Sequence, residues 1–264
     1  MLKTLAFTLL CLTVLPLSAA ESIIIGGSGA DLETFRILSR QFSQQHPNIR
    51  IKILPSIGSG GAVRGVSSQR VDIGLMSRPL SQKEALLGLH SLHYANTALI
   101  FITNKNQPIT NVTLKELQGI YNGHNPVGGL KPVLRPHSDS DTLLLQENLP
   151  ELIPAMNNAF SRTGIPIGIT DQTTVQMVRD IDRVISTSTL SLVLSEKQDL
   201  NVLSLNGVTP TVETIGNGSY PLCKKLFMLH DGQLNNDERL FINFINSAEG
   251  QAILTDTGHQ PVDL

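Results

Sequence analysis

Three short segments combine small hydroxyl residues with the start of a helical pattern. They read GGSGAD (26–31), GSGGAV (58–63) and RPHSDSDT (135–142). A helix N-terminus leaves backbone N–H groups unpaired and carries about half a positive charge, so it attracts anions. Three such starts that point at one place would form a cage for a tetrahedral oxyanion. Arg78 and Arg135 can add forked, charge-assisted contacts to such an anion.

Each turn taken singly also has a purely structural interpretation. Ser and Asp are common N-caps, and Gly is common in turns. Three similar turns in one chain favour a binding site over three independent caps.

Signatures of several enzyme classes are missing from the sequence. There is no G-x-x-x-x-G-K-[ST] loop, no G-x-S-x-G elbow and no S-x-x-K, and GSGADL has Leu32 where a dinucleotide-binding turn has its third glycine. His90 and His93 form an H-x-x-H pair, with His124 and His137 further along, but no E-x-x-H or C-x-x-C supports a zinc site. We therefore expect solvated loop histidines, no metal, no cofactor and no enzymatic activity.

The composition limits the possible partners. The chain has 264 residues, a formal net charge of −2, 16% charged residues and no Trp. It has no basic excess to neutralise a nucleic-acid backbone or anionic lipid, and few aromatic rings on which bases could stack. We expect no nucleic-acid partner and a soluble protein of one large domain or two smaller ones.

Residues 1–20 have the pattern of a secretory signal peptide. Lys3 gives a positive start, Leu5–Leu17 is apolar but too short to span a bilayer, and residues 18–20 form a small-residue cleavage site. We therefore expect an exported mature protein that begins near Glu21.

The two cysteines are not expected to form a disulfide. Cys11 lies within the predicted signal segment, and it lacks the small residues that precede a lipid-modified cysteine. Its removal leaves Cys223 alone, in an apolar run, where we expect a buried and inert thiol.

Hydrophobic periodicity predicts alternating strands and helices, which is typical of an α/β fold with a mainly parallel sheet. Predicted strands cover residues 22–25, 49–53, 71–75, 96–103, 165–169, 184–187, 202–205 and 222–229. Predicted helices follow the first two glycine-rich turns and cover residues 141–148, 174–180 and 236–253.

The apolar runs at 96–103 and 222–229 bear on the architecture. They are candidates for strands that cross between two lobes, with a ligand in the cleft between the lobes. A single continuous domain is the alternative, and the sequence pattern leaves both open.

Several of these segments, taken together, resemble a known family. PSIGSGGAVRGV, VDIGLMSRPL, ALIFITNKNQPITNVTLKELQGIYNG, RPHSDSDT and EGQAILTDTGHQPVD are similar to segments of the phosphate-binding proteins of bacterial ABC phosphate importers. The resemblance extends in order over nearly all of the mature chain. It implies a two-lobed periplasmic binding protein, type II-like, with a mostly parallel, helix-flanked sheet in each lobe. The implied division is lobe 1 at 21–96, completed by 229–264, and lobe 2 at 97–228.

The resemblance also implies a function. Such a protein closes on inorganic phosphate in the periplasm and delivers it to an ABC permease in the inner membrane, and we expect it to act as a monomer. The implied phosphate contacts are Ser28, Gly29, Ser59, Gly60, Ser77, Arg135, Ser140, Asp141 and Thr142.

Two departures from the family pattern concern the ligand. The third segment reads Ser140-Asp141-Thr142 where the family usually has Ser-Gly-Thr, and the turn MSRPL lacks the acid that many relatives carry. A carboxylate beside a dianion is unfavourable unless the two share a proton. Asp141 is therefore our candidate acceptor for the phosphate proton, with Asp139 in reserve. The alternative is that either acid simply caps the helix.

Other functions stay open at this point. The same fold can bind sulfate, molybdate or tungstate. An exported hydrolase would use Ser28 or Ser59 as its nucleophile, although no matching base signature is present. A secreted interaction protein that has lost its ligand is a further alternative.

Overall fold

The computed structural model describes residues 22–124 and 127–263. The predicted signal segment 1–20, with Cys11, lies outside the described residues, as does Glu21. Within the described part, no helix has the length and apolar character to cross a membrane.

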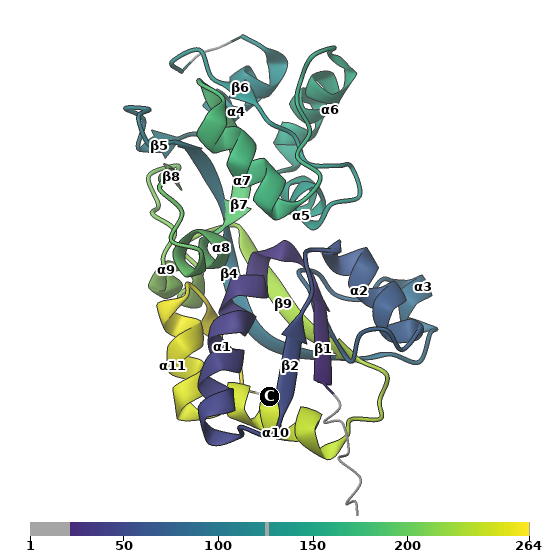
Figure 1. Cartoon of the computed structure of the whole chain (residues 1–264). Helices are drawn as coiled ribbons and strands as arrows, with labels where there is room; N and C mark the ends of the chain where they lie inside the picture. Colours follow the sequence, from purple (N-terminus) through teal and green to yellow (C-terminus); the bar gives the residue numbers. More distant parts are fainter. Residues whose placement is uncertain (1–21, 125–126, 264) are drawn as a thin grey trace, which may run out of the picture.

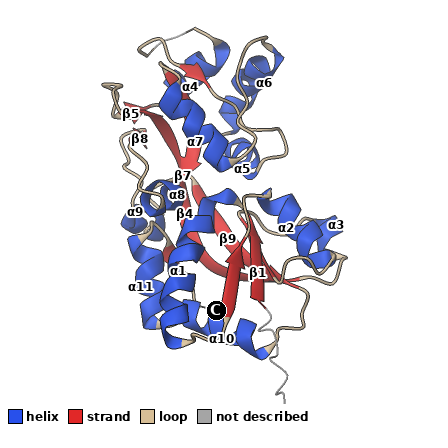
Figure 2. Cartoon of the chain, in the orientation of Figure 1, coloured by secondary structure: helices blue, strands red, loops and turns tan. Residues whose placement is uncertain are grey.

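Strands and helices alternate along the chain, as Figures 1 and 2 show. The strands are β1 (Ser22–Gly27), β2 (Arg50–Ile53), β3 (Ile73–Met76), β4 (His90–Asn104), β5 (Asn111–Val112), β6 (Lys131–Pro132), β7 (Val184–Thr189), β8 (Leu200–Leu205), β9 (Cys223–His230) and β10 (Gln260–Pro261). The helices are η1 (Gly29–Asp31), α1 (Leu32–Gln45), α2 (Gly58–Ser67), α3 (Gln82–Ala85), α4 (Leu114–Asn122), α5 (Ser140–Asn148), η2 (Pro150–Leu152), α6 (Ile153–Ser161), α7 (Asp171–Asp180), α8 (Leu190–Ser195), α9 (Val212–Gly216), α10 (Asn236–Ile245) and α11 (Ala248–Asp256).

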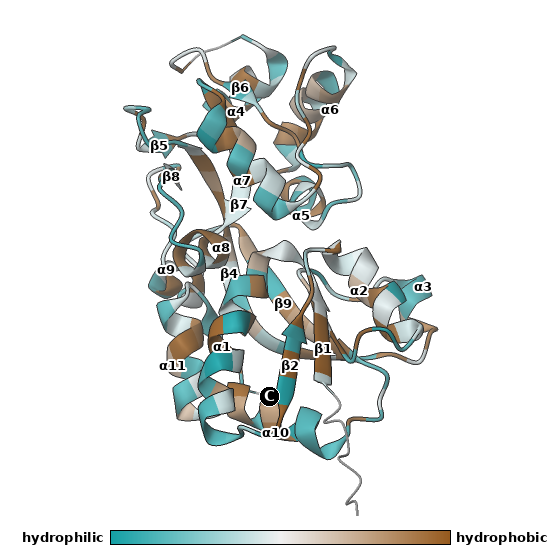
Figure 3. Ribbon diagram, viewed as in Figure 1, coloured by the Kyte–Doolittle hydropathy of each residue, from teal (hydrophilic) through white to brown (hydrophobic). Residues whose placement is uncertain are grey.

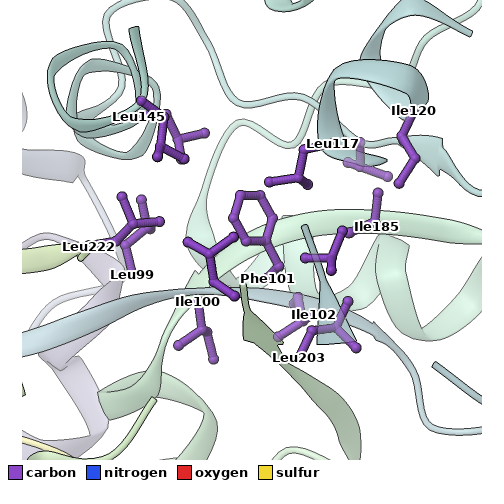
Figure 4. Close-up of a cluster of buried hydrophobic side chains, with 14 of the residues drawn as sticks. Leu99, Ile100, Phe101, Ile102, Leu117, Ile120, Leu145, Ile185, Leu203 and Leu222 are labelled. Carbon is purple, nitrogen blue, oxygen red and sulfur yellow. The ribbon is translucent and has the colours of Figure 1, made fainter. Parts of the chain in front are cut away.

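Among the described residues, the two larger apolar cores lie in different lobes, and a third, smaller core lies under α2. One core contains Phe35, Phe42 and Phe241, in the lobe that holds β1, β2, β3, α1, α10 and α11. The other core lies in the lobe that holds α4 to α7, and Figure 4 shows its centre around Phe101 and Leu117. Strand β4 contributes residues to both cores. The predicted two-lobed α/β fold is therefore confirmed.

The sheet is mixed, which differs from the mostly parallel sheet that was predicted. β1 pairs in parallel with β2 and β3, β5 with β8, and β6 with β7. Among the described residues, every pair that includes β4 or β9 is antiparallel. These two strands run past each other between the lobes, and a continuous apolar run does not reveal the direction of its neighbours.

Hydropathy follows the layers of the fold. Figure 3 shows the apolar character of β1, while much of the outer surface of α1 is hydrophilic. Helix α1 buries Phe35, Leu38 and Phe42 at spacings of three and four, so one stripe of the helix faces the core.

Several predicted elements differ in extent from the structure, among them the strand predicted at 96–103, which spans His90–Asn104 as β4. Residues 165–169 form no strand, only an isolated bridge from Leu134 to Ile167. Helix α7 starts at Asp171 rather than near residue 174. The predicted helix 236–253 is two helices, because Ser247 caps a new one by accepting a hydrogen bond from the Gly250 N–H at 3.2 Å.

The boundary between the lobes is closely packed. Helix α8 packs on α1 and η1, and Ser191 Oγ donates to the Ala30 carbonyl at 3.2 Å. Thr97 Oγ1 donates to the Gly258 carbonyl at 2.9 Å. Segments within 97–228 therefore touch the other lobe, and the lobe limits given above stay a prediction.

Candidate functional site

A cleft of about 450 Å³ lies where the three predicted segments meet. Its walls come from β1–η1, the start of α2, the loop before α5 and the start of α7. The lining residues are Ser28, Ser56, Ile57, Gly58, Ser59, Gly60, Gly61, Arg64, Arg78, Arg135, Pro136, Ser138, Asp139, Ser140, Ile169, Thr170 and Asp171.

Three serines from three separate turns are linked in the first lobe. Ser28 is 4% exposed, and its Oγ accepts a hydrogen bond from the Ala30 N–H at 3.3 Å. Ser77 Oγ donates to Ser28 Oγ at 2.5 Å, and the Ser77 N–H donates to Ser59 Oγ at 3.1 Å. The ends of β1 and β3 and the start of α2 are thereby fixed relative to one another.

Helix α2 opens onto the cleft with its first turn uncapped. Its N-cap residue is Ile57, which makes no side-chain cap bond, and Gly58 has a φ of +68° that other residues rarely adopt. The N–H groups of this turn therefore remain available to an anion. Arg64, on the same helix, lines the same cleft.

Arg135 is a buried cation of the second-lobe wall and is 5% exposed. All of its guanidinium N–H directions are used. Nε and Nη2 donate to Asp139 at 3.2 and 2.8 Å, Nη2 also donates to Asp171 at 3.1 Å, and Nη1 donates to the Gly168 carbonyl and to Thr174 Oγ1 at 3.2 and 2.6 Å. An anion in the cleft must therefore compete with carboxylates for this side chain.

The start of α5 forms the wall beside Arg135. Asp139 caps the helix, because its Oδ1 accepts from the Asp141 N–H at 2.9 Å. Ser140 lines the cleft, whereas Thr142 is buried and donates from Oγ1 to the Arg135 carbonyl at 3.3 Å.

Asp141 does not lie where a proton acceptor for the ligand would be needed. The residue is 1% exposed, and its carboxylate binds Lys224 Nζ through Oδ1 and accepts from Thr187 Oγ1 at 2.8 Å through Oδ2. Burial alone would raise the pKa of Asp141, but Lys224 and Arg135 hold it below its ordinary value. The structure thus turns this side chain away from the cleft, toward β9 and β7.

Asp171 is a cleft carboxylate that the sequence did not indicate. It is the first residue of α7, and burial together with repulsion from Asp141 and Asp139 raises its pKa to about 6 despite the neighbouring Arg135. A Cβ added at Gly29 would lie 2.6 Å from Asp171 Oδ2, so glycine is required for this approach between the lobes. The sequence pattern predicts the helix start three residues too late, although Thr170-Asp171 is a recognisable cap pair.

Arg78 lines the cleft but has an acidic partner of its own. Nη1 and Nη2 donate to the two Glu84 oxygens at 2.7 and 2.8 Å. This hydrogen bonding lowers the pKa of Glu84 to about 2. The Arg78–Glu84 ion pair therefore stabilises the segment after β3, and the Arg78 guanidinium is not free to bind an anion.

Five of the nine predicted contact residues line the cleft, namely Ser28, Ser59, Gly60, Arg135 and Ser140. The other four lie behind this lining, namely Gly29, Ser77, Asp141 and Thr142. Which of these residues contact a ligand stays a prediction.

Neither the four histidines singled out above nor Cys223 line the cleft, although His137 lies in the loop that also carries Arg135. His90 and His93 lie on β4 rather than in the predicted loop, while His124 and His137 lie in exposed loops. The described residues contain no group of three or more potential metal ligands. Cys223 is only partly buried, and burial raises the pKa of its thiol.

Comparisons with known proteins agree with this architecture. A family model described as the PBP superfamily domain matches residues 16–249. The chain is 26% identical over 223 residues to the phosphate-binding protein PstS of Borreliella burgdorferi, covering 76% of each chain. It is 23% identical over 255 residues to PstS of Bacillus subtilis, covering 92% of this chain and 82% of that one.

A solved structure extends the likeness to the fold. A phosphate ABC transporter substrate-binding protein from Clostridium perfringens, solved with bound phosphate, superimposes with a TM-score of 0.79. That match covers 92% of this chain and 100% of the other, at 24% identity.

Proposed function

The chain belongs to the PBP superfamily, and on that premise we propose that it captures inorganic phosphate in the interlobe cleft and delivers it to an ABC importer. The relatives named as phosphate-binding proteins cover most of this chain. Such a receptor holds its ligand without transforming it.

One observation carries the proposal. One cleft is lined by hydrogen-bond donors from several elements. They are the uncapped N–H groups of α2, the hydroxyls of Ser28 and Ser59, the start of α5 at Ser140 and the guanidinium of Arg135. These groups come from both lobes, and together they offer donors in several directions to a small anion.

Calorimetric titration of the phosphate-free protein tests the proposal. At a hundredfold excess of phosphate over the dissociation constant, the free energy of unfolding should rise by about 2.7 kcal/mol. A protein that gives no heat and gains no thermal stability at millimolar phosphate would refute the proposal.

Asp171 is our candidate for the residue that distinguishes phosphate from sulfate. Phosphate near neutral pH keeps a proton that a cleft carboxylate can accept, whereas fully ionised sulfate is repelled. Asp171 takes this role in place of Asp141, because Asp171 lines the cleft and Asp141 does not.

A serine hydrolase is not favoured by the contacts of the candidate nucleophiles. In the described part of the chain, Ser28 and Ser59 hydrogen-bond to Ser77 and to a backbone N–H, not to a histidine or carboxylate that would take their proton.

Export and transfer complete the proposal. Residues 1–20 would direct the protein to the periplasm, where it acts as a monomer and docks on the permease of the inner membrane. N-terminal sequencing of the protein recovered from the periplasm should then begin near Glu21. Full-length protein in the cytoplasm would contradict this part of the proposal.

A further inference from the structure

The second-lobe wall of the cleft holds three carboxylates around one arginine, and those of Asp141 and Asp171 are buried. Arg135 Nη2 lies 2.8 Å from Asp139 Oδ2 and 3.1 Å from Asp171 Oδ1, and Arg135 Nε lies 3.9 Å from Asp141 Oδ2. One cation and three carboxylates together carry a net negative charge. This charge repels an anion strongly, because charges in a buried site are weakly screened.

Lys224 adds a second cation to this group from behind the wall. It lies on β9, is 1% exposed and forms an ion pair with Asp141 Oδ1. Lys224 is not among the residues that line the cleft. Burial alone would lower its pKa, but Asp141, Asp171 and Asp139 raise the pKa above its ordinary value, so Lys224 is charged at neutral pH.

We propose that Lys224 is a positioning residue for anion binding, because it neutralises Asp141 and so keeps a third carboxylate from opposing the attraction of Arg135 for the anion. The inference rests on the proposed function and extends it to a residue that does not touch the ligand. Asp141 lies between the two cations, and without Lys224 its nearest cation is Arg135.

A purely structural role for the pair makes a different prediction. In that case the pair only ties α5 to β9, and any variant that loses the tie binds the anion less well. In the charge-balancing role, removal of both partners restores binding, because the Asp141 charge disappears together with that of Lys224. The double variant should remain folded, because neutral replacement of both members of a buried ion pair is often tolerated, whereas removal of one partner is destabilising.

The test is a double-mutant cycle. Calorimetric titration measures the affinity for inorganic phosphate, and thermal unfolding measures the stability. The proteins are wild type, Lys224→Met, Asp141→Asn and the double variant. Lys225→Met is the matched control, since it removes the same charge from an exposed position on the same strand. We expect Lys224→Met to bind at least tenfold more weakly than wild type, by analogy with other buried charges that lose a partner.

The remaining variants give the diagnostic results. The phosphate affinity of the double variant should lie within about threefold of wild type, and Asp141→Asn should bind no more weakly than wild type. The affinity of the Lys225→Met control should lie within about twofold of wild type, as for other exposed charges. If Lys224→Met does not fold, the comparison of the double variant with wild type decides the question.

Any one of three results would overturn the inference. In the first, Lys224→Met binds phosphate as tightly as wild type. In the second, the double variant binds more than tenfold more weakly than wild type. In the third, the Lys225→Met control loses as much affinity as Lys224→Met. Wild type that does not bind phosphate refutes the proposed function as well, so the two failures are distinguishable.

Discussion

Replacement of Asp171 by asparagine tests the electrostatics of the cleft most directly. Burial raises the pKa of this carboxyl from 3.8 to about 6, and repulsion from Asp141 and Asp139 acts in the same direction against the attraction of Arg135. A carboxyl whose pKa is higher in the folded than in the unfolded state holds its proton more tightly when folded. Its contribution to stability is therefore fully present below about pH 4 and is lost as the pH rises through about 6.

The magnitude follows from the size of this shift. A difference of about two pH units corresponds to about 3 kcal/mol, at about 1.4 kcal/mol per unit. The asparagine amide that replaces the carboxyl has no titratable proton. The difference in unfolding free energy between wild type and Asp171→Asn should thus fall by about 2 kcal/mol between pH 4 and pH 7, which is most of the full amount.

Urea unfolding of the phosphate-free proteins, followed by circular dichroism across this pH range, measures the difference. Asp180→Asn is the control, since it removes an exposed carboxylate from the other end of α7. Binding gives a second measurement. At pH 7.5 the phosphate-to-sulfate affinity ratio should fall at least tenfold in Asp171→Asn, because the variant no longer repels sulfate.

Two results together would refute this reasoning. They are stability curves of wild type and Asp171→Asn that run parallel from pH 4 to pH 7, and a phosphate-to-sulfate ratio that the substitution leaves unchanged. Asp171 would then be only a hydrogen-bond partner of Arg135. A changed ratio with parallel curves would keep the selectivity role and refute the raised pKa.

Three further predictions concern the cations and the lobes. Arg135→Ala should weaken phosphate binding at least tenfold in calorimetry, since truncation of a buried partner of an anion costs about 2–5 kcal/mol. Arg78→Ala should change the affinity less than about threefold, because Arg78 is engaged by Glu84 and such partly exposed pairs contribute little; a damaging Arg78→Ala with a silent Arg135→Ala would reverse the assignment. Small-angle scattering should give a smaller radius of gyration with phosphate than without it, and equal radii would indicate a cleft that is rigid or already closed.

The turns that form the cleft could be predicted from the sequence, because their residue types are characteristic of helix starts. Ser28, Ser59 and Ser140 stand at helix starts, where small hydroxyl residues and glycines are favoured by the local backbone. Apolar periodicity located most strands and helices for the same reason. It did not separate α10 from α11, because the residues on both sides of the cap at Ser247 continue the apolar pattern.

Long-range partners were decided only by the tertiary structure. The sequence offered Asp141 as a ligand contact, but pairing with Lys224 and Thr187 turns its carboxylate into the interior. Asp171 reaches the cleft because α7 packs against η1, and strand direction depends on how β4 and β9 pass between the lobes. Pairing, burial and charge balance depend on residues far apart in the chain, so no pattern within a single segment specifies them.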